Sequence, residues 1–148
     1  MNSTKSSVEN TKPAAAINAA DAADASEPMQ ALAAVKDASG LYDFQVLQYH
    51  AERPGFRISE IELGKKQQVP WHYHNHVQDT FYVLTGEMRL FLQHPKQEVR
   101  RKPGETFAAA PRRPHLVTNA GDAPMRFLVL QGIGEYDYVP LVPVKGTA

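Results

Sequence analysis

The sequence contains no cysteine among its 148 residues, and this absence removes several kinds of site. Without cysteine there is no disulfide, no thiolate ligand for a metal ion and no cysteine nucleophile. The lack of disulfides fits a reducing compartment, and we expect the protein to lie in the cytoplasm.

The chain also lacks an excess of charge of either sign and any long apolar run. Sixteen basic side chains balance 16 acidic ones. Proteins that bind nucleic acids or anionic membranes normally carry a basic excess, so we expect neither partner. No apolar run approaches the roughly 20 residues that span a bilayer. The absence of a Gly-x-Ser-x-Gly sequence and of a phosphate-binding glycine-rich loop argues against a serine hydrolase or an ATPase.

Aromatic residues are missing from the first 40 positions, which hold 12 alanines. Residues 1–27 have few large apolar side chains, so burial cannot offset the loss of chain entropy and we expect disorder. Residues 28–39 read equally well as a short helix that stops at Gly40 or as a linker. The sequence therefore predicts a mostly disordered or partly helical tail over 1–40 and a folded domain over 41–148.

The folded domain shows segments of strand length, separated by turn residues, and no long helical periodicity. Residues 88–92 alternate between apolar and polar side chains after a hairpin signal at 85–87. The spacing predicts an all-β sandwich or barrel, which can hold a small molecule in its mouth. The expected strands cover residues 43–48, 56–63, 67–74, 80–84, 88–92, 98–101, 106–109, 116–119, 125–130 and, as a final edge strand, 138–144.

Four of the six histidines lie in two short segments, and two of them suggest a metal site. His72 and His74 are two residues apart, so on a strand both imidazoles project from the same face. Imidazole suits zinc, iron, copper and nickel, and an added carboxylate extends the range to manganese. A buried pair of hydrogen-bonded histidines would give the same string, so the pair alone leaves both interpretations open.

The residues around these histidines resemble the two motifs of the cupin family. The first motif is His-x-His, three or four residues, glutamate, six residues and glycine, and the segment from His72 through Asp79 to Gly86 has this spacing. The second motif matches Gly104, Pro111, His115 and Asn119. The resemblance covers about residues 43–140 and implies a jelly roll or small β-barrel. It also implies that His72, His74, Asp79 and His115 bind a divalent metal ion inside the barrel.

The sequence departs from the first motif at the acidic position, where the family has glutamate and this chain has Asp79. An aspartate side chain is one methylene shorter, which leaves open whether it reaches a metal without a shift of the backbone. Gln78 is a possible alternative oxygen ligand or an orienting group. His76 is likewise an alternative ligand, an orienting group or a solvated loop residue.

The second departure is a pair of arginines just before the histidine of the second motif. Arg112 and Arg113 precede His115 where the family usually has a small, glycine-containing stretch. Guanidinium groups at the barrel rim could clamp the carboxylate or phosphate of a substrate. A solvated turn is the other interpretation of the same residues.

The resemblance implies iron, manganese, zinc or nickel as cofactor and a small-molecule substrate inside the barrel. We expect a dioxygenase-like or related oxidoreductase, although no catalytic residue can be named. An isomerase or lyase of the cupin family and a non-catalytic module that binds a sugar or organic acid are the alternatives, because the fold does not select among them. Small cupins commonly dimerise, so the resemblance also implies a homodimer.

Overall fold

The computed structural model describes residues 28–144, so the tail expected over 1–27 lies outside the described residues. The described chain consists of strands and turns without any helix, so none of it forms a helical membrane span. The strands, in chain order, are β1 (Met29–Ala31), β2 (Val46–Arg53), β3 (Phe56–Leu63), β4 (Gln68–Tyr73), β5 (Gln78–Thr85), β6 (Met88–Leu92), β7 (Gln97–Arg101), β8 (Thr106–Ala109), β9 (His115–Asn119), β10 (Met125–Gly132) and β11 (Val139–Pro143).

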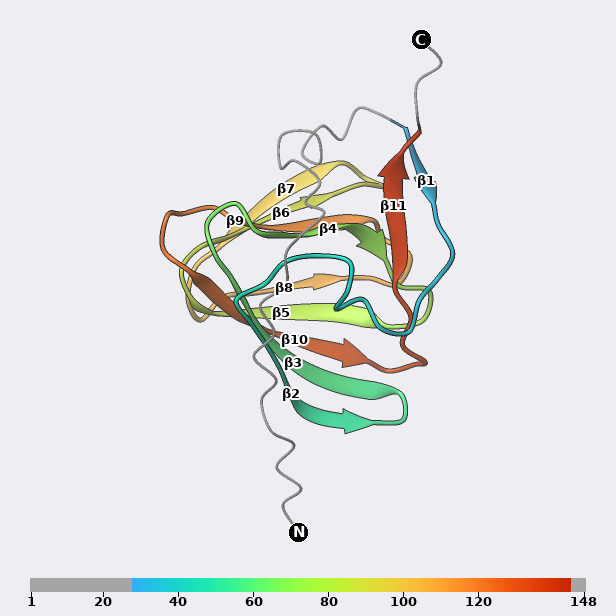
Figure 1. Ribbon diagram of the computed structural model, residues 1–148, viewed down its shortest axis with the longest axis horizontal. Coiled ribbons are helices and arrows are strands. Elements are labelled where there is room, and N and C mark those ends of the chain that lie inside the picture. The colour runs from blue at the N-terminus through green and yellow to red at the C-terminus, as the bar shows by residue number, and fades with distance from the viewer. Residues whose placement is uncertain (1–27, 145–148) are drawn as a thin grey trace.

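The strands form two antiparallel sheets that face each other (Figure 1). One sheet has six strands in the order β1-β11-β4-β9-β6-β7, and the other has five in the order β2-β3-β10-β5-β8. Neighbours in a sheet are often distant in the chain, as β10 is from β3 and β5 on either side of it. Two packed sheets with such crossing connections form a jelly roll, which confirms the expected all-β class.

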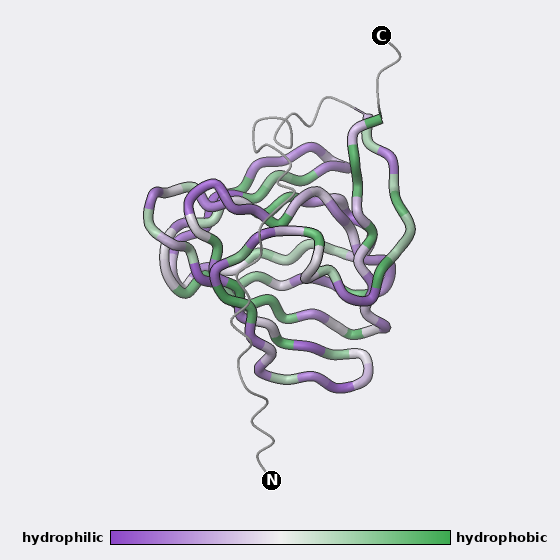
Figure 2. Tube along the Cα trace, viewed as in Figure 1, coloured by the Kyte–Doolittle hydropathy of each residue, from purple (hydrophilic) through white to green (hydrophobic). Residues whose placement is uncertain are grey.

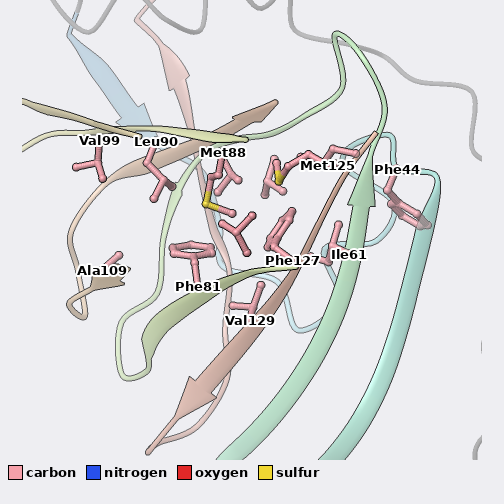
Figure 3. Close-up of a cluster of buried hydrophobic side chains, with 14 of the residues drawn as sticks. Phe44, Ile61, Phe81, Met88, Leu90, Val99, Ala109, Met125, Phe127 and Val129 are labelled. Atoms are coloured by element: carbon pink, nitrogen blue, oxygen red, sulfur yellow. The ribbon is translucent and has the colours of Figure 1, made fainter. Parts of the chain in front are cut away.

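Alternating side chains along the strands fill the space between the sheets. Met88, Leu90 and Leu92 of β6 are fully buried, and Figure 2 shows hydrophobic and hydrophilic positions alternating along the chain. In Figure 3 the side chains of Met88 and Leu90 point from one sheet toward Phe81 and Phe127 of the other. Burying one such side chain stabilises the fold by about 1.5–3 kcal/mol, so this alternation holds the two sheets together.

Residues 28–39 belong to the fold, which corrects the expectation of a short helix or a linker in this part of the tail. Residues 29–31 form β1, which pairs with β11, so β11 is an internal strand and not the expected edge. Val35 then forms a bridge with Tyr138, and Ala38 is buried in the core. A short helix over 28–39 would leave β11 without these backbone partners.

The first long strand also differs from its expected position. β2 runs from Val46 to Arg53, later than the 43–48 expected from sequence. Arg53 pairs with Phe56 across a tight turn, so the strand continues up to Pro54. Gly55 has a φ of 79°, which glycine adopts without steric cost, and it allows β2 and β3 to join in a short hairpin.

Candidate metal centre

Three histidines and one aspartate from both sheets meet between them. His72 in β4 is the direct cross-strand partner of His115 in β9, and His74 follows the end of β4. Asp79 lies in β5 of the facing sheet (Figure 1). One potential ligand atom from each side chain lies within 4.8 Å of all the others, and all four residues are buried. The structure therefore brings together the complete set of residues that the motifs nominate.

A carboxylate oxygen lies at the middle of this group. Oδ2 of Asp79 is 2.8 Å from Nε2 of His74, 3.0 Å from Nε2 of His115 and 3.9 Å from Nε2 of His72. The shorter aspartate side chain therefore does reach the three imidazoles.

The backbone fixes which nitrogen of each imidazole faces the centre. Nδ1 of His72 lies 2.7 Å from the carbonyl oxygen of Pro70, and Nδ1 of His115 lies 2.8 Å from that of Arg113. Nδ1 of His74 bonds to the carbonyl oxygen of Asp137. Because a carbonyl oxygen only accepts, all three Nδ1 atoms must carry a hydrogen. In a neutral ring, Nε2 then carries a free lone pair, which faces Asp79. Metal-binding histidines usually have this form, with one ring N–H donated to the protein and the other nitrogen free for the metal.

These lone pairs make the cluster a site for positive charge. Burial opposes a charge on His74, but the Asp79 carboxylate outweighs it and raises the pKa of His74. Burial and the neighbouring His115 lower the pKa of His72 to about 3. Burial would raise the pKa of Asp79, but His74 and the other imidazoles hold it well below its usual range. A proton or a metal ion must separate these facing acceptors, and three nitrogens with one oxygen fit zinc, iron, manganese or nickel.

Asp79 is held by a neighbour that the sequence did not single out. Gln131 in β10 is its cross-strand partner, and the Gln131 amide donates to Oδ1 of Asp79 at 2.9 Å. This bond leaves Oδ2 to face the imidazoles. Nε of Arg57 in turn donates to Oε1 of Gln131 at 2.9 Å. Gln131 and Arg57 occupy positions of β10 and β3 that face the interior. A polar side chain at an inward-facing position was the signal that the sequence offered.

Neither of the alternative ligands joins the group. Gln78 precedes Asp79 on β5, so its side chain points to the opposite face, where its amide donates to Oγ1 of Thr80. His76 is exposed in the turn between β4 and β5.

The two arginines of the second motif reach the centre through their backbones. The N–H of Arg112 donates to the carbonyl oxygen of His74 at 2.7 Å, and the carbonyl of Arg113 accepts the bond from His115. The Arg113 guanidinium bonds instead to the carbonyl of Pro95 and to the Gln97 side chain. The guanidinium of Arg112 lies on an exposed residue. The turn thus positions two histidines, and neither side chain is placed as the expected substrate clamp.

A cavity of about 40 Å³ adjoins the cluster and is bordered by His72 and Asp79. Tyr138 stacks on the ring of His72, with 4.2 Å between ring centroids. The Tyr138 hydroxyl is buried and has no hydrogen-bond partner among the described residues. The cavity is therefore bordered by the aromatic side chain of Tyr138 as well as by the cluster.

Comparison with known proteins agrees with this architecture. A family model described as "Cupin domain" matches residues 59–131, which contain all four clustered residues. An uncharacterized protein of Methanocaldococcus jannaschii is 29% identical over 68 residues, which are 46% of this chain and 51% of that protein. The match thus spans about half the length of this curated relative.

Two solved structures have a similar fold. A protein with a double-stranded β-helix domain from Klebsiella pneumoniae is 21% identical, with a TM-score of 0.58 over 72% of this chain and 90% of its own. An oxalate oxidase is 17% identical, with a TM-score of 0.54 over 58% of this chain and 46% of its own. At these identities the likeness concerns the fold alone. The two motifs, the jelly roll and the family match agree, and the chain is a small cupin-domain protein.

Proposed function

We propose that the protein is a metal-dependent enzyme that acts on a small organic molecule, of the dioxygenase-like or related oxidoreductase type. The proposal rests on one observation. Three imidazoles with their Nδ1 hydrogens bound to backbone carbonyls direct Nε2 toward the same oxygen of Asp79. His72, His74, Asp79 and His115 would hold a first-row divalent ion. Such an ion supplies Lewis acidity and, when it is iron or manganese, redox chemistry.

The surrounding residues suit a reaction shielded from water. Phe81 and Val117 line the cavity next to the cluster, so a molecule held there has apolar walls on part of its surface. A water-poor site strengthens the effect of nearby charges and hydrogen-bond donors on a bound molecule.

An oxalate oxidase has a similar fold, so this architecture is compatible with an oxidoreductase. Isomerases and lyases with this fold can use the same kind of ligand set, and so can a module that only binds a sugar or an organic acid. Consumption of the bound molecule separates an enzyme from such a module.

The first test is elemental analysis of protein purified without chelators. The His72→Ala/His115→Ala double variant should lose the stoichiometric metal that the unaltered protein retains. His50→Ala is the matched control, because His50 is exposed and bonds to Glu60 away from the cluster. Equal metal content in the double variant and the control would refute the ligand assignment.

The second test measures oxygen uptake with candidate diols and diketones after loading with Fe(II). We expect uptake and a new product that both depend on iron. A compound that raises the Tm but is recovered unchanged would instead show a binding module.

A further inference from the structure

Arg57 lies at the boundary between the inner cavity and the outside of the barrel. It shares the inward face of β3 with Ser59 and Ile61, and all three line the inner cavity. A second depression of about 220 Å³ lies beyond it. Arg57, Gln131 and Tyr136 line both spaces. These three side chains therefore stand between the outer depression and the inner cavity that His72 and Asp79 border.

The guanidinium is held in place without a carboxylate partner. Its carbon lies 3.7 Å from the ring centroid of Tyr136 and 5.0 Å from that of Tyr49. Nε donates to Gln131, which fixes the orientation of the group. Within residues 28–144 no carboxylate forms an ion pair with Arg57, whereas Arg126 pairs with both Glu60 and Glu62. Glu52 is the cross-strand partner of Arg57 and lines the outer depression, but it forms no ion pair with it. Arg57 is thus an oriented, partly buried cation without an ion-pair partner among residues 28–144.

The rest of the cavity also favours a negatively charged molecule. Asp79 is the only acidic residue among the described residues that line it. Tyr42 also lines the cavity, and a tyrosine hydroxyl can donate a hydrogen bond to an anion. A divalent ion with one carboxylate ligand keeps a net positive charge, and Arg57 adds another. Hydrogen-bond donors and positive charge therefore outnumber the groups that could repel an anion.

We propose that Arg57 binds the carboxylate of a small carboxylic acid substrate and directs the rest of that molecule toward the cluster of His72, His74, Asp79 and His115. This inference rests on the proposed function and narrows its substrate class. A guanidinium held by stacking can pair with a carboxylate through two parallel hydrogen bonds. The inner cavity of about 40 Å³ limits the remainder of the molecule to a few heavy atoms unless side chains move.

The test compares glycolate with glycolamide, which have similar shapes and differ in charge. Zinc-loaded protein is titrated with each compound by calorimetry. We expect glycolate to bind more tightly than glycolamide, and Arg57→Gln to weaken glycolate binding by about tenfold or more. Arg57→Lys should fall between, because a lysine keeps the charge but loses the forked geometry. Arg89→Gln is the control, since Arg89 pairs with Glu98 on the other sheet and its loss changes the net charge equally.

Equal affinity of the unaltered protein for the two compounds would overturn the proposal, and so would unchanged glycolate binding by Arg57→Gln. Because zinc itself prefers a carboxylate to an amide, the comparison of the two compounds is repeated on metal-free protein. Equal affinity there would overturn the proposal even if Arg57→Gln fails to fold.

Zinc content, measured on each sample, separates this test from the proposed metal site. If the protein holds no zinc, the metal proposal fails, and the carboxylate anchor is judged on metal-free protein. A glycolate-induced rise in Tm in the unaltered protein, absent in Arg57→Gln, would then support the anchor. Equal rises would refute it.

Discussion

Asp79 and Gln131 face each other on neighbouring strands of the five-stranded sheet, and their side chains are joined by a 2.9 Å hydrogen bond. The bond occupies Oδ1 of Asp79, while Oδ2 of the same carboxylate lies among the three imidazoles. One strand pair thereby sets the direction of the only carboxylate in the described cluster.

Replacing Gln131 should therefore weaken metal binding although it is not a ligand. In Gln131→Ala the buried Oδ1 loses its donor and the carboxylate is free to rotate, so we expect affinity to fall by about 10–100-fold. Competition with a chelator of known affinity measures the change. Gln78→Ala is the matched control, because Gln78 is adjacent to Asp79 in sequence but points away from the cluster. A larger loss in Gln78→Ala would contradict the assignment.

The low pKa of His72 predicts a pH dependence of stability in the metal-free protein. Burial and His115 lower this pKa from 6.5 to about 3, so the folded chain keeps the ring neutral while the unfolded chain takes up a proton near pH 6.5. The free energy of unfolding should therefore decrease as the pH falls from 6.5 to about 4. One such group changes the free energy of unfolding by at most about 1.4 kcal/mol per pH unit.

The two charged neighbours do not cancel this slope. Because the pKa of His74 is raised in the folded chain, His74 stabilises the fold fully below pH 6.5. This stabilisation is lost only as the pH rises through the folded-state pKa of His74. Because the pKa of Asp79 is lowered in the folded chain, Asp79 stabilises the fold above about pH 4. This stabilisation is lost as the pH falls through the folded-state pKa of Asp79. Urea unfolding of the unaltered protein and of His72→Gln, both in chelator, isolates the effect of His72. Parallel pH profiles in the two proteins would show that His72 titrates normally.

The sequence was sufficient to predict the fold class from local spacing, and the resemblance to the cupin motifs nominated the clustered residues. His72 and His74 share a face through the period of two, and the second motif places His115 on a separate strand. The cross-strand pairing of His72 with His115 then follows from the jelly roll. The predicted convergence of these residues with Asp79 agrees with the structure.

The remaining features depend on contacts between distant parts of the chain. β1 has a short, weakly strand-forming sequence, and its pairing with β11 comes from a segment about 110 residues later. The sequence left Arg112 and Arg113 open as a substrate clamp or a solvated turn, and it could not show that their backbone atoms make the contacts with the histidines. The orientation of Arg57 could be determined only once β3 had a known inner face. The homodimer and the cytoplasmic location stay predictions.

Removing the Tyr138 hydroxyl should leave the fold as stable or make it more stable. This hydroxyl is buried and has no partner among the described residues, so folding costs its hydration without a compensating hydrogen bond. We expect Tyr138→Phe to raise the free energy of unfolding by up to about 1 kcal/mol, with unchanged metal content. Denaturant unfolding measures this, and Tyr73→Phe on the half-buried end of β4 is the comparison. A loss of stability in Tyr138→Phe alone would reveal a hydrogen bond to this hydroxyl.

Gly86, the last residue of the first motif, should be required for packing and not for metal binding. Its φ is +78°, and a Cβ there would lie 2.9 Å from the Cα of Met125. Gly104 has a similar φ of +85° but has no atom within 4 Å of such a Cβ. Ala at either position bears the backbone strain of about 1 kcal/mol, and Gly86→Ala adds a clash with backbone that cannot move cheaply.

We therefore expect Gly86→Ala to lose about 1–3 kcal/mol more stability than Gly104→Ala, because the clash resembles overpacking of a core. Denaturant unfolding of both variants gives the difference, and elemental analysis should find the same metal content in each. Because both variants carry the same strain in φ, their difference isolates the contact between the β5–β6 turn and the start of β10. Equal destabilisation would mean that the turn shifts to relieve the clash, and that its glycine is needed for conformation alone.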